Sequence, residues 1–173
     1  PILSASGVHY DGERGGHGDR NTAIGTGVPM NVQQLLDGKG TMVATIRADA
    51  TLAEATASLR DHGVGALVVS ADGRELTGIL SERDVVRAMA AHGSSTLGRD
   101  VASAMSGNVV TCRPDDTCDD LMAMMTERRI RHLPVVDGDG SLAGIISIGD
   151  VVKARLGQLE LENNQLHEYI QAR

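Results

Sequence analysis

Two Ser-x-x-Asp elements are the residues of this chain best suited to bind a charged ligand. Ser81 and Asp84 form the first, and Ser147 and Asp150 form the second. Each Ser lies between a predicted strand and a predicted helix, so the first amides of that helix lack partners within it. These amides and the positive end of the helix dipole favour a phosphate. The Asp carboxylate would repel a phosphate but can accept hydrogen bonds from ribose hydroxyls. A nucleotide would therefore satisfy both groups.

The same spacing also has a purely structural interpretation. Ser-x-x-Asp resembles the capping box, in which Ser or Thr and a later Glu or Gln satisfy free helix amides, although Asp is a shorter partner than usual. Duplication does not separate the two interpretations, because a cap is copied together with its fold. Both remain open from these residues alone.

The two elements belong to a repeat that covers most of the chain. Residues 78–86 return as residues 144–152, an offset of 66 residues, and the same offset aligns the upstream residues without a gap. Self-similarity at a fixed period indicates a duplicated supersecondary unit, and two copies are too few for a solenoid. We therefore expect a closed pair in which each copy covers the apolar face of the other.

Each copy has the same predicted order of elements, β-α-β-β-α. Strands are expected at residues 43–46, 65–70 and 76–80 in the first copy, and at 109–112, 131–136 and 142–146 in the second. Helices are expected to begin after Thr51 and Ser81, and after Thr117 and Ser147. A short helix is expected at residues 31–36.

The chain divides into four expected segments. Residues 1–29 are rich in Gly, Asp, Arg and Thr without apolar periodicity, which predicts a flexible leader or an expression remnant. The first copy is expected at residues 30–95, the second at residues 96–155, and a terminal helix at residues 156–173.

Apolar residues in the last segment are spaced three and four apart, at Leu156, Leu159, Leu166 and Ile170, with Asn163 in the same series. This is the a/d spacing of a coiled coil with one polar core position. Barely two heptads are present, fewer than a coiled coil normally needs. A helix packed on its own domain and a short dimer-forming helix, with Asn163 setting the register, are both open.

Composition excludes several classes of function. The chain has 173 residues, a net charge of −7, two Tyr, no Phe and no Trp. Nucleic-acid binding is not expected of such an acidic chain, and a bound base would have to lie between aliphatic side chains. Nothing resembles a signal peptide or a membrane span, so we expect a cytoplasmic protein. Cys112 and Cys118 are expected to be buried, reduced thiols.

The duplicated order, ending each time in Gly-h-h-Ser-x-x-Asp-h-h where h is apolar, resembles the cystathionine-β-synthase (CBS) domain family. The resemblance covers about residues 30–155, and the segments 81–87 and 131–136 are typical of small stand-alone bacterial members. It implies an α/β (α+β) fold of two CBS domains packed sheet to sheet as a pseudo-two-fold pair, a Bateman module. It also implies two clefts that accept AMP, ADP, ATP or NAD, with S-adenosylmethionine less expected.

The resemblance places the binding residues by position. Ser81 and Asp84 would face the second strand of the other copy, where Ile130 would contact the adenine. Arg131 and His132 would reach the phosphates, and Arg83 adds a cation to the same cleft.

The second cleft is expected to differ. Ser147 and Asp150 would face Val64, Gly65 and Ala66, which are uncharged. This cleft should bind adenosine compounds more weakly, prefer a less charged ligand, or stay empty. Aliphatic walls against the bases are expected from Val43 and Val109.

Together with this resemblance, the residues predict a non-enzymatic sensor that binds an adenine nucleotide, forms a homodimer and signals to an unidentified partner protein. No nucleophile and base, metal-ligand motif or required cofactor is recognisable. The alternative is a ligand-free structural module that mediates dimer or complex assembly.

Overall fold

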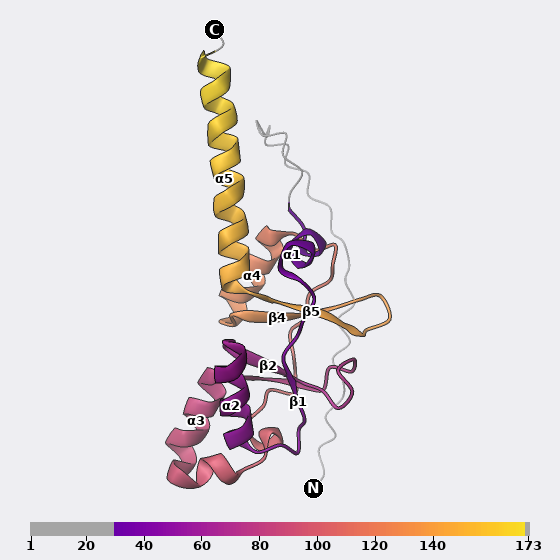
Figure 1. Ribbon diagram of the computed structural model, residues 1–173, viewed down its shortest axis with the longest axis vertical. Coiled ribbons are helices and arrows are strands. Elements are labelled where there is room, and N and C mark those ends of the chain that lie inside the picture. Colours follow the sequence, from indigo (N-terminus) through magenta and orange to yellow (C-terminus); the bar gives the residue numbers. More distant parts are fainter. Residues whose placement is uncertain (1–29, 172–173) are drawn as a thin grey trace, which may run out of the picture.

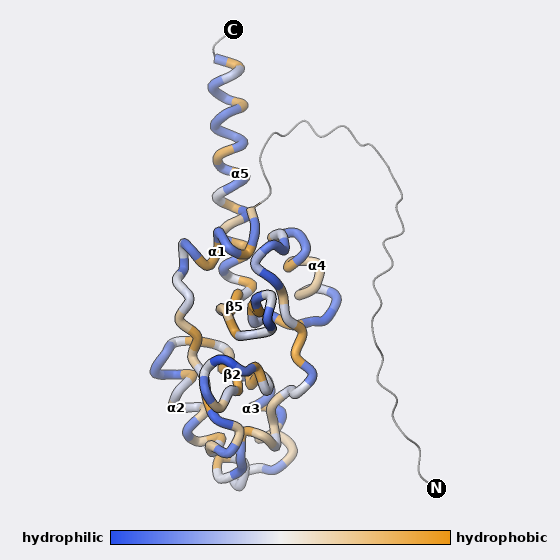
Figure 2. Tube along the Cα trace, turned by 90° about the vertical axis from the view of Figure 1, so that its right-hand side faces the viewer, coloured by the Kyte–Doolittle hydropathy of each residue, from blue (hydrophilic) through white to orange (hydrophobic). Residues whose placement is uncertain are grey.

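The computed structural model describes residues 30–171 of the chain, so the leader predicted at residues 1–29 lies outside the described residues. Two small sheets lie next to each other in the middle of the body, and helices cover their outer sides (Figure 1). The orange, hydrophobic stretches of the trace concentrate in this central region (Figure 2). The fold is the expected mixed α/β pair of duplicated domains.

The first domain has a three-stranded sheet in the order β1-β2-β3, in which β1 and β2 are parallel and β2 and β3 antiparallel. Its strands are β1 (Thr45–Ile46), β2 (Ala66–Val69) and β3 (Gly78–Ser81). Its helices are α2 (Leu52–His62) and α3 (Glu82–His92), followed by 3-10 turns at Gly93–Gly98 and Val101–Ser103. Fully buried aliphatic side chains such as Leu52, Leu67 and Leu80 form the core.

The second domain repeats this order with a narrower sheet. It contains α4 (Cys118–Arg128), β4 (His132–Val136), β5 (Leu142–Ser147) and α5 (Ile148–Gln171), with β4 and β5 antiparallel. The strand expected at residues 109–112 is reduced to a single bridge between Cys112 and Val135. The amide of Cys112 donates to the carbonyl of Pro134, and its carbonyl accepts a bond from the amide of Val136.

The threonine caps define where α2 and α4 begin, as expected. Thr51 accepts a hydrogen bond from the amide of Glu54, and Thr117 accepts one from the amide of Asp120. Each threonine amide in turn donates to the acidic side chain, which completes a capping box.

The helix α1 (Val32–Lys39) precedes the first domain in sequence but packs into the core of the second. Its Leu36 lies so close to β5 that a methyl group at Gly144 would be 2.6 Å from Leu36 Cδ2. The segment before the second domain does the converse, because the amide of Leu52 donates to the carbonyl of Arg99 and Val101 is buried in the first core. The segment that precedes each domain in the sequence therefore packs into the core of the other domain.

Within the described residues, no helix combines the length and the apolar character needed to cross a membrane. Cys112 and Cys118 are free and buried, as expected. Burial raises the pKa of the Cys112 thiol to about 12, with a smaller contribution from nearby Asp116, so this thiol stays protonated.

Candidate functional site

A cleft of about 540 Å³ opens where the start of α3 meets the second domain. It gathers seven of the residues predicted from the sequence: Ser81, Arg83, Asp84, Val109, Ile130, Arg131 and His132. The first three come from the β3–α3 junction, and the last three come from the turn into β4. The duplication therefore brings a helix start of one domain against a strand start of the other.

The Ser81–Asp84 pair is a cap in this structure. The amide and the hydroxyl of Ser81 donate to Asp84 Oδ2 at 2.9 Å and 2.6 Å. The other carboxylate oxygen, Oδ1, accepts no hydrogen bond from residues 30–171 and lies 3.9 Å from Arg87 Nη1. Capping occupies one oxygen and leaves the second able to accept from a ligand hydroxyl. The structural and the ligand-binding interpretations of this motif are thus compatible.

Positive charge dominates the cleft although the whole chain is acidic. Five arginines line it (Arg83, Arg87, Arg128, Arg129 and Arg131), against the carboxylates of Glu82 and Asp84, among the described residues. Arginine pairs well with phosphate because its planar guanidinium offers several donors. Ile79, Val109, Val110 and Ile130 add aliphatic surface on which a base could lie.

Arg83 links the two domains at the cleft. Its Nη1 donates to the backbone carbonyl of Arg129 at 3.0 Å, so part of this guanidinium is already engaged. Arg129 itself has a left-handed backbone, with φ of 54°. The 66-residue offset pairs it with Gly63, which ends α2 at φ of 63°. An arginine thus replaces a glycine where the backbone favours glycine.

His132 is half-buried at the start of β4 and lines the cleft. A methyl group at Gly65 would lie 3.2 Å from His132 Cε1, so the absence of a side chain at Gly65 makes room for the ring. Burial lowers the pKa of His132, and the charges of Arg131 and Lys39 lower it further, while Glu82 and Asp150 act against this. His132 is therefore neutral near pH 7, and an adjacent phosphate would favour its charged form.

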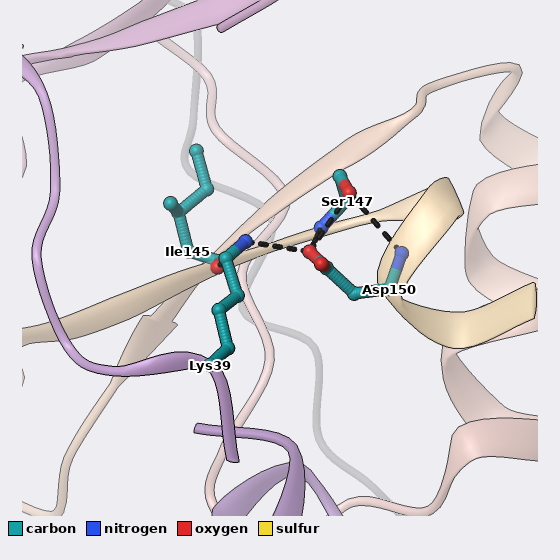
Figure 3. A network of polar contacts seen from close by, with 4 residues as sticks. All are labelled: Lys39, Ile145, Ser147 and Asp150. Atoms are coloured by element: carbon teal, nitrogen blue, oxygen red, sulfur yellow. Dashed lines mark hydrogen bonds and ion pairs between the residues drawn. The ribbon is translucent and has the colours of Figure 1, made fainter. Parts of the chain in front are cut away.

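The second helix start is chemically different (Figure 3). Ser147 donates to Asp150 Oδ2 through its amide and its hydroxyl, both at 2.8 Å. Lys39 Nζ donates to the same oxygen at 2.5 Å and to the carbonyl of Ile145 at 3.1 Å. Burial would raise the pKa of Asp150, but hydrogen bonds from Lys39 and Ser147 outweigh burial and lower it.

The surroundings expected for Asp150 were uncharged, and the Lys39–Asp150 contact corrects that expectation. Of the other residues assigned to this side, Val64 packs against the core of the first domain and Val43 is half-buried. Neither of them, nor Ser147 or Asp150, lines the arginine-rich cleft.

Several cleft residues were missed by the sequence argument. Arg128 and Arg129 end α4, Arg87 lies one turn along α3, and Asn108 precedes Val109. Arg129 had a usable signal, because the repeat alignment places it opposite Gly63 at the end of a predicted helix. Lys39 had none, since it lies 111 residues from Asp150 in sequence. Among the described residues, no group of three His, Cys, Asp or Glu side chains could hold a metal ion.

Comparisons with known proteins cover both copies of the repeat. The model of the CBS domain family matches residues 41–91 and residues 99–157. The mitochondrial CBS domain-containing protein CBSX3 of Arabidopsis thaliana is 38% identical over 127 residues, which cover 71% of this chain and 61% of the plant protein.

Solved structures share the fold. A CBS-domain-containing protein of Agrobacterium tumefaciens is 48% identical, with a TM-score of 0.70 over 73% of this chain and 99% of that one. A CBS domain protein of Pyrobaculum aerophilum, solved in complex with AMP, is 26% identical, with a TM-score of 0.66 over 78% of this chain and 99% of that one.

Proposed function

Because this chain belongs to the CBS domain family, we propose that it is a regulatory module that binds an adenine nucleotide between its two domains. The observation that carries the proposal is the convergence at one cleft of Ser81 and Asp84 with Arg131 and His132. The first pair supplies a helix start and a carboxylate, and the second supplies groups for a phosphate. The AMP complex of the Pyrobaculum relative supports the same ligand class.

The ligand lies across the start of α3. Its adenine packs between Val109 and Ile130, and its ribose hydroxyls donate to Asp84 Oδ1. Its phosphate is held by Arg131, with Arg129 within the same cleft. The arginines that line the cleft suit AMP, ADP, ATP or NAD better than S-adenosylmethionine, which carries a positive sulfonium and no phosphate.

Binding is coupled to a change in the relative placement of the two domains. The cleft is built from both, and the Arg83–Arg129 hydrogen bond crosses between them. A ligand that prefers one placement shifts the population toward it by its differential affinity. A partner protein reads this placement, and the module itself catalyses no reaction.

Isothermal titration of the full chain with AMP, ADP, ATP, NAD, S-adenosylmethionine and adenosine tests this function. We expect phosphate-bearing ligands to bind and adenosine to bind at least about tenfold more weakly, since a charge-assisted hydrogen bond contributes about 1.5–3 kcal/mol. Arg131→Ala should weaken AMP binding by a similar factor. Arg60→Ala is the matched control, because it removes the same charge from an exposed ion pair with Asp61.

The second candidate is a ligand-free assembly module. The observation in its favour is apolar surface on α3 and α5, where Val86 and Val152 are 63% and 45% exposed. It predicts a stable dimer and no heat with any of the six ligands. If Arg131→Ala bound AMP with unchanged affinity, the nucleotide would bind at a different site.

A further inference from the structure

We propose that α5 pairs with α5 of a second copy of this chain as a short, parallel, in-register coiled coil. This pairing concerns a surface separate from the nucleotide cleft and does not depend on the proposed function. Three observations carry it: an exposed apolar stripe, one polar residue within that stripe, and complementary charges beside it.

The apolar stripe runs along a helix that leaves the body. The first turns of α5 pack on α1, α4 and β5, and the rest extends well beyond them (Figure 1). Positions spaced four and three apart stay exposed along its whole length: Val152 45%, Leu156 56%, Leu159 46%, Leu166 61% and Ile170 70%. Because exposed apolar surface at heptad spacing is stabilised by a facing helix, this stripe defines the seam of a coiled coil.

Asn163 selects the partner and its direction. In this heptad register, the a positions are Leu156, Asn163 and Ile170, and the d positions are Leu159 and Leu166. In a parallel pair, a positions face a positions, so Asn163 meets the Asn163 of the second copy and the two amides hydrogen-bond. In an antiparallel pair, a positions face d positions, and the amide would be buried against leucine. A single Asn at a and Leu at d are the known determinants of a parallel dimer.

Charges flanking the stripe agree with the parallel direction. The g position of one helix faces the e position of the next heptad on the other helix. This pairs Arg155 with Glu160 of the second copy, and Glu162 with His167 of the second copy. The first pair joins an arginine to a carboxylate, and the second joins a carboxylate to a histidine. The helix is therefore complementary to a second copy of itself.

This arrangement also orients the domains. Because α5 follows β5 without a break, a parallel pair brings the second domain of one copy beside the second domain of the other. The seam begins at Val152, at the base of the helix, so domain contacts and helix contacts are continuous.

Disulfide trapping of the full chain without nucleotide tests the direction. Leu166→Cys places a thiol at a d position, and Leu161→Cys is the matched control, because Leu161 is 65% exposed but lies at an f position. The native thiols Cys112 and Cys118 are buried. With copper phenanthroline as oxidant, we expect Leu166→Cys to form a covalent dimer at least about tenfold faster than Leu161→Cys. Equal rates would overturn the proposal.

An antiparallel pair would give a different pattern. Leu166→Cys (d) would then cross-link mainly with Leu156→Cys (a) in a mixture of the two variants, and that result would also overturn the proposal. Sedimentation velocity supplies a second measure: Leu159→Asp with Leu166→Asp should weaken the dimer at least about tenfold, since two charges enter the seam. Leu161→Asp should leave it unchanged. Equal weakening by both would contradict a role for the seam.

Discussion

Lys39 Nζ lies 2.5 Å from Asp150 Oδ2, so a residue that precedes the first domain neutralises the carboxylate at the start of α5. The residue 66 positions later in the repeat is Met105, which does not line the arginine-rich cleft. The two helix starts share a capping geometry but differ in what faces the Asp. At Asp84 the cations belong to the cleft wall, whereas at Asp150 a lysine bonds Oδ2, the same oxygen that accepts the capping bonds from Ser147.

Removal of Lys39 should open the second helix start to an adenosine ligand. Lys39→Met removes a cation that competes with ribose hydroxyls as a donor to the Asp150 carboxylate. The pair is partly exposed and screened by solvent, so the gain in affinity is modest, about two- to fivefold. Titration with adenosine should show a number of sites that rises from about one toward two.

Lys153→Met is the control, because it removes the same charge from an exposed position on α5. If Lys39→Met left the number of sites unchanged, the lysine would not compete with a ligand.

Replacement of Asp84 should separate capping from ligand binding. Asp84→Ala removes the acceptor of Ser81 and should lower the free energy of unfolding by about 1 kcal/mol, the usual cost of a lost cap. It should weaken AMP binding at least about tenfold, because a charged acceptor for the ribose is lost as well. Urea denaturation and calorimetric titration measure the two effects.

The chain offers a close control for this variant. The hydroxyl of Thr117 donates to Asp120 Oδ2 at 2.6 Å, the same distance as from Ser81 to Asp84 Oδ2. Asp120→Ala should therefore have a similar cost in stability and leave AMP affinity intact. An equal loss of affinity in both variants would assign Asp84 to structure alone.

Arg129 should contribute to binding at the expense of stability. A non-glycine residue in the left-handed region costs about 1–2 kcal/mol, and glycine returns part of this through the entropy of the unfolded chain. Arg129→Gly should therefore raise the free energy of unfolding by about 0.5–1 kcal/mol while weakening AMP binding. Gly63→Ala, at the equivalent position with φ of 63°, should lower stability instead. If Arg129→Gly had a lower free energy of unfolding than the unsubstituted chain, the backbone at Arg129 would not be strained.

His132 should make stability depend on pH. Its pKa in the folded chain is lowered by burial and then by Arg131 and Lys39, below the ~6.5 of an unfolded histidine. Between the two values the unfolded chain binds more protons, so stability rises with pH in that window. The stabilisation is complete above about pH 6.5 and is lost as the pH falls toward the lower, folded value.

Urea denaturation between about pH 5 and pH 7.5 measures this slope. His132→Gln should flatten it, whereas His92→Gln, at an exposed position on α3, should not. A slope that persists in His132→Gln would have to come from other groups.

The parts of the fold that depend on local signals were predictable from sequence. Thr51 and Thr117 begin α2 and α4 as expected, because a capping box is made by residues three apart. The expected strand at residues 109–112 shrinks to Cys112, because its pairing depends on how β4 lies rather than on its own residues. The helix expected from residue 156 is present through Gln171 and continues without interruption from Ile148 as α5.

The candidate site shows the same difference between local signals and long-range contacts. Repeat alignment and family resemblance placed Asp84 and Arg131 in one cleft, which the structure forms. They could not place Lys39, because nothing in its neighbourhood indicates that α1 packs on the other domain. The segment before each domain packs on the other domain, and this contact depends on the topology of the whole chain. The repeat in the sequence does not show on which domain each of these segments packs.

The exchange of α1 has a consequence for biosynthesis. Leu36 is translated well before Gly144, against which it packs. The nascent first domain therefore carries an unmatched apolar helix until β5 has been translated. We expect each domain, expressed without the segment that completes it, to be less stable than the intact pair.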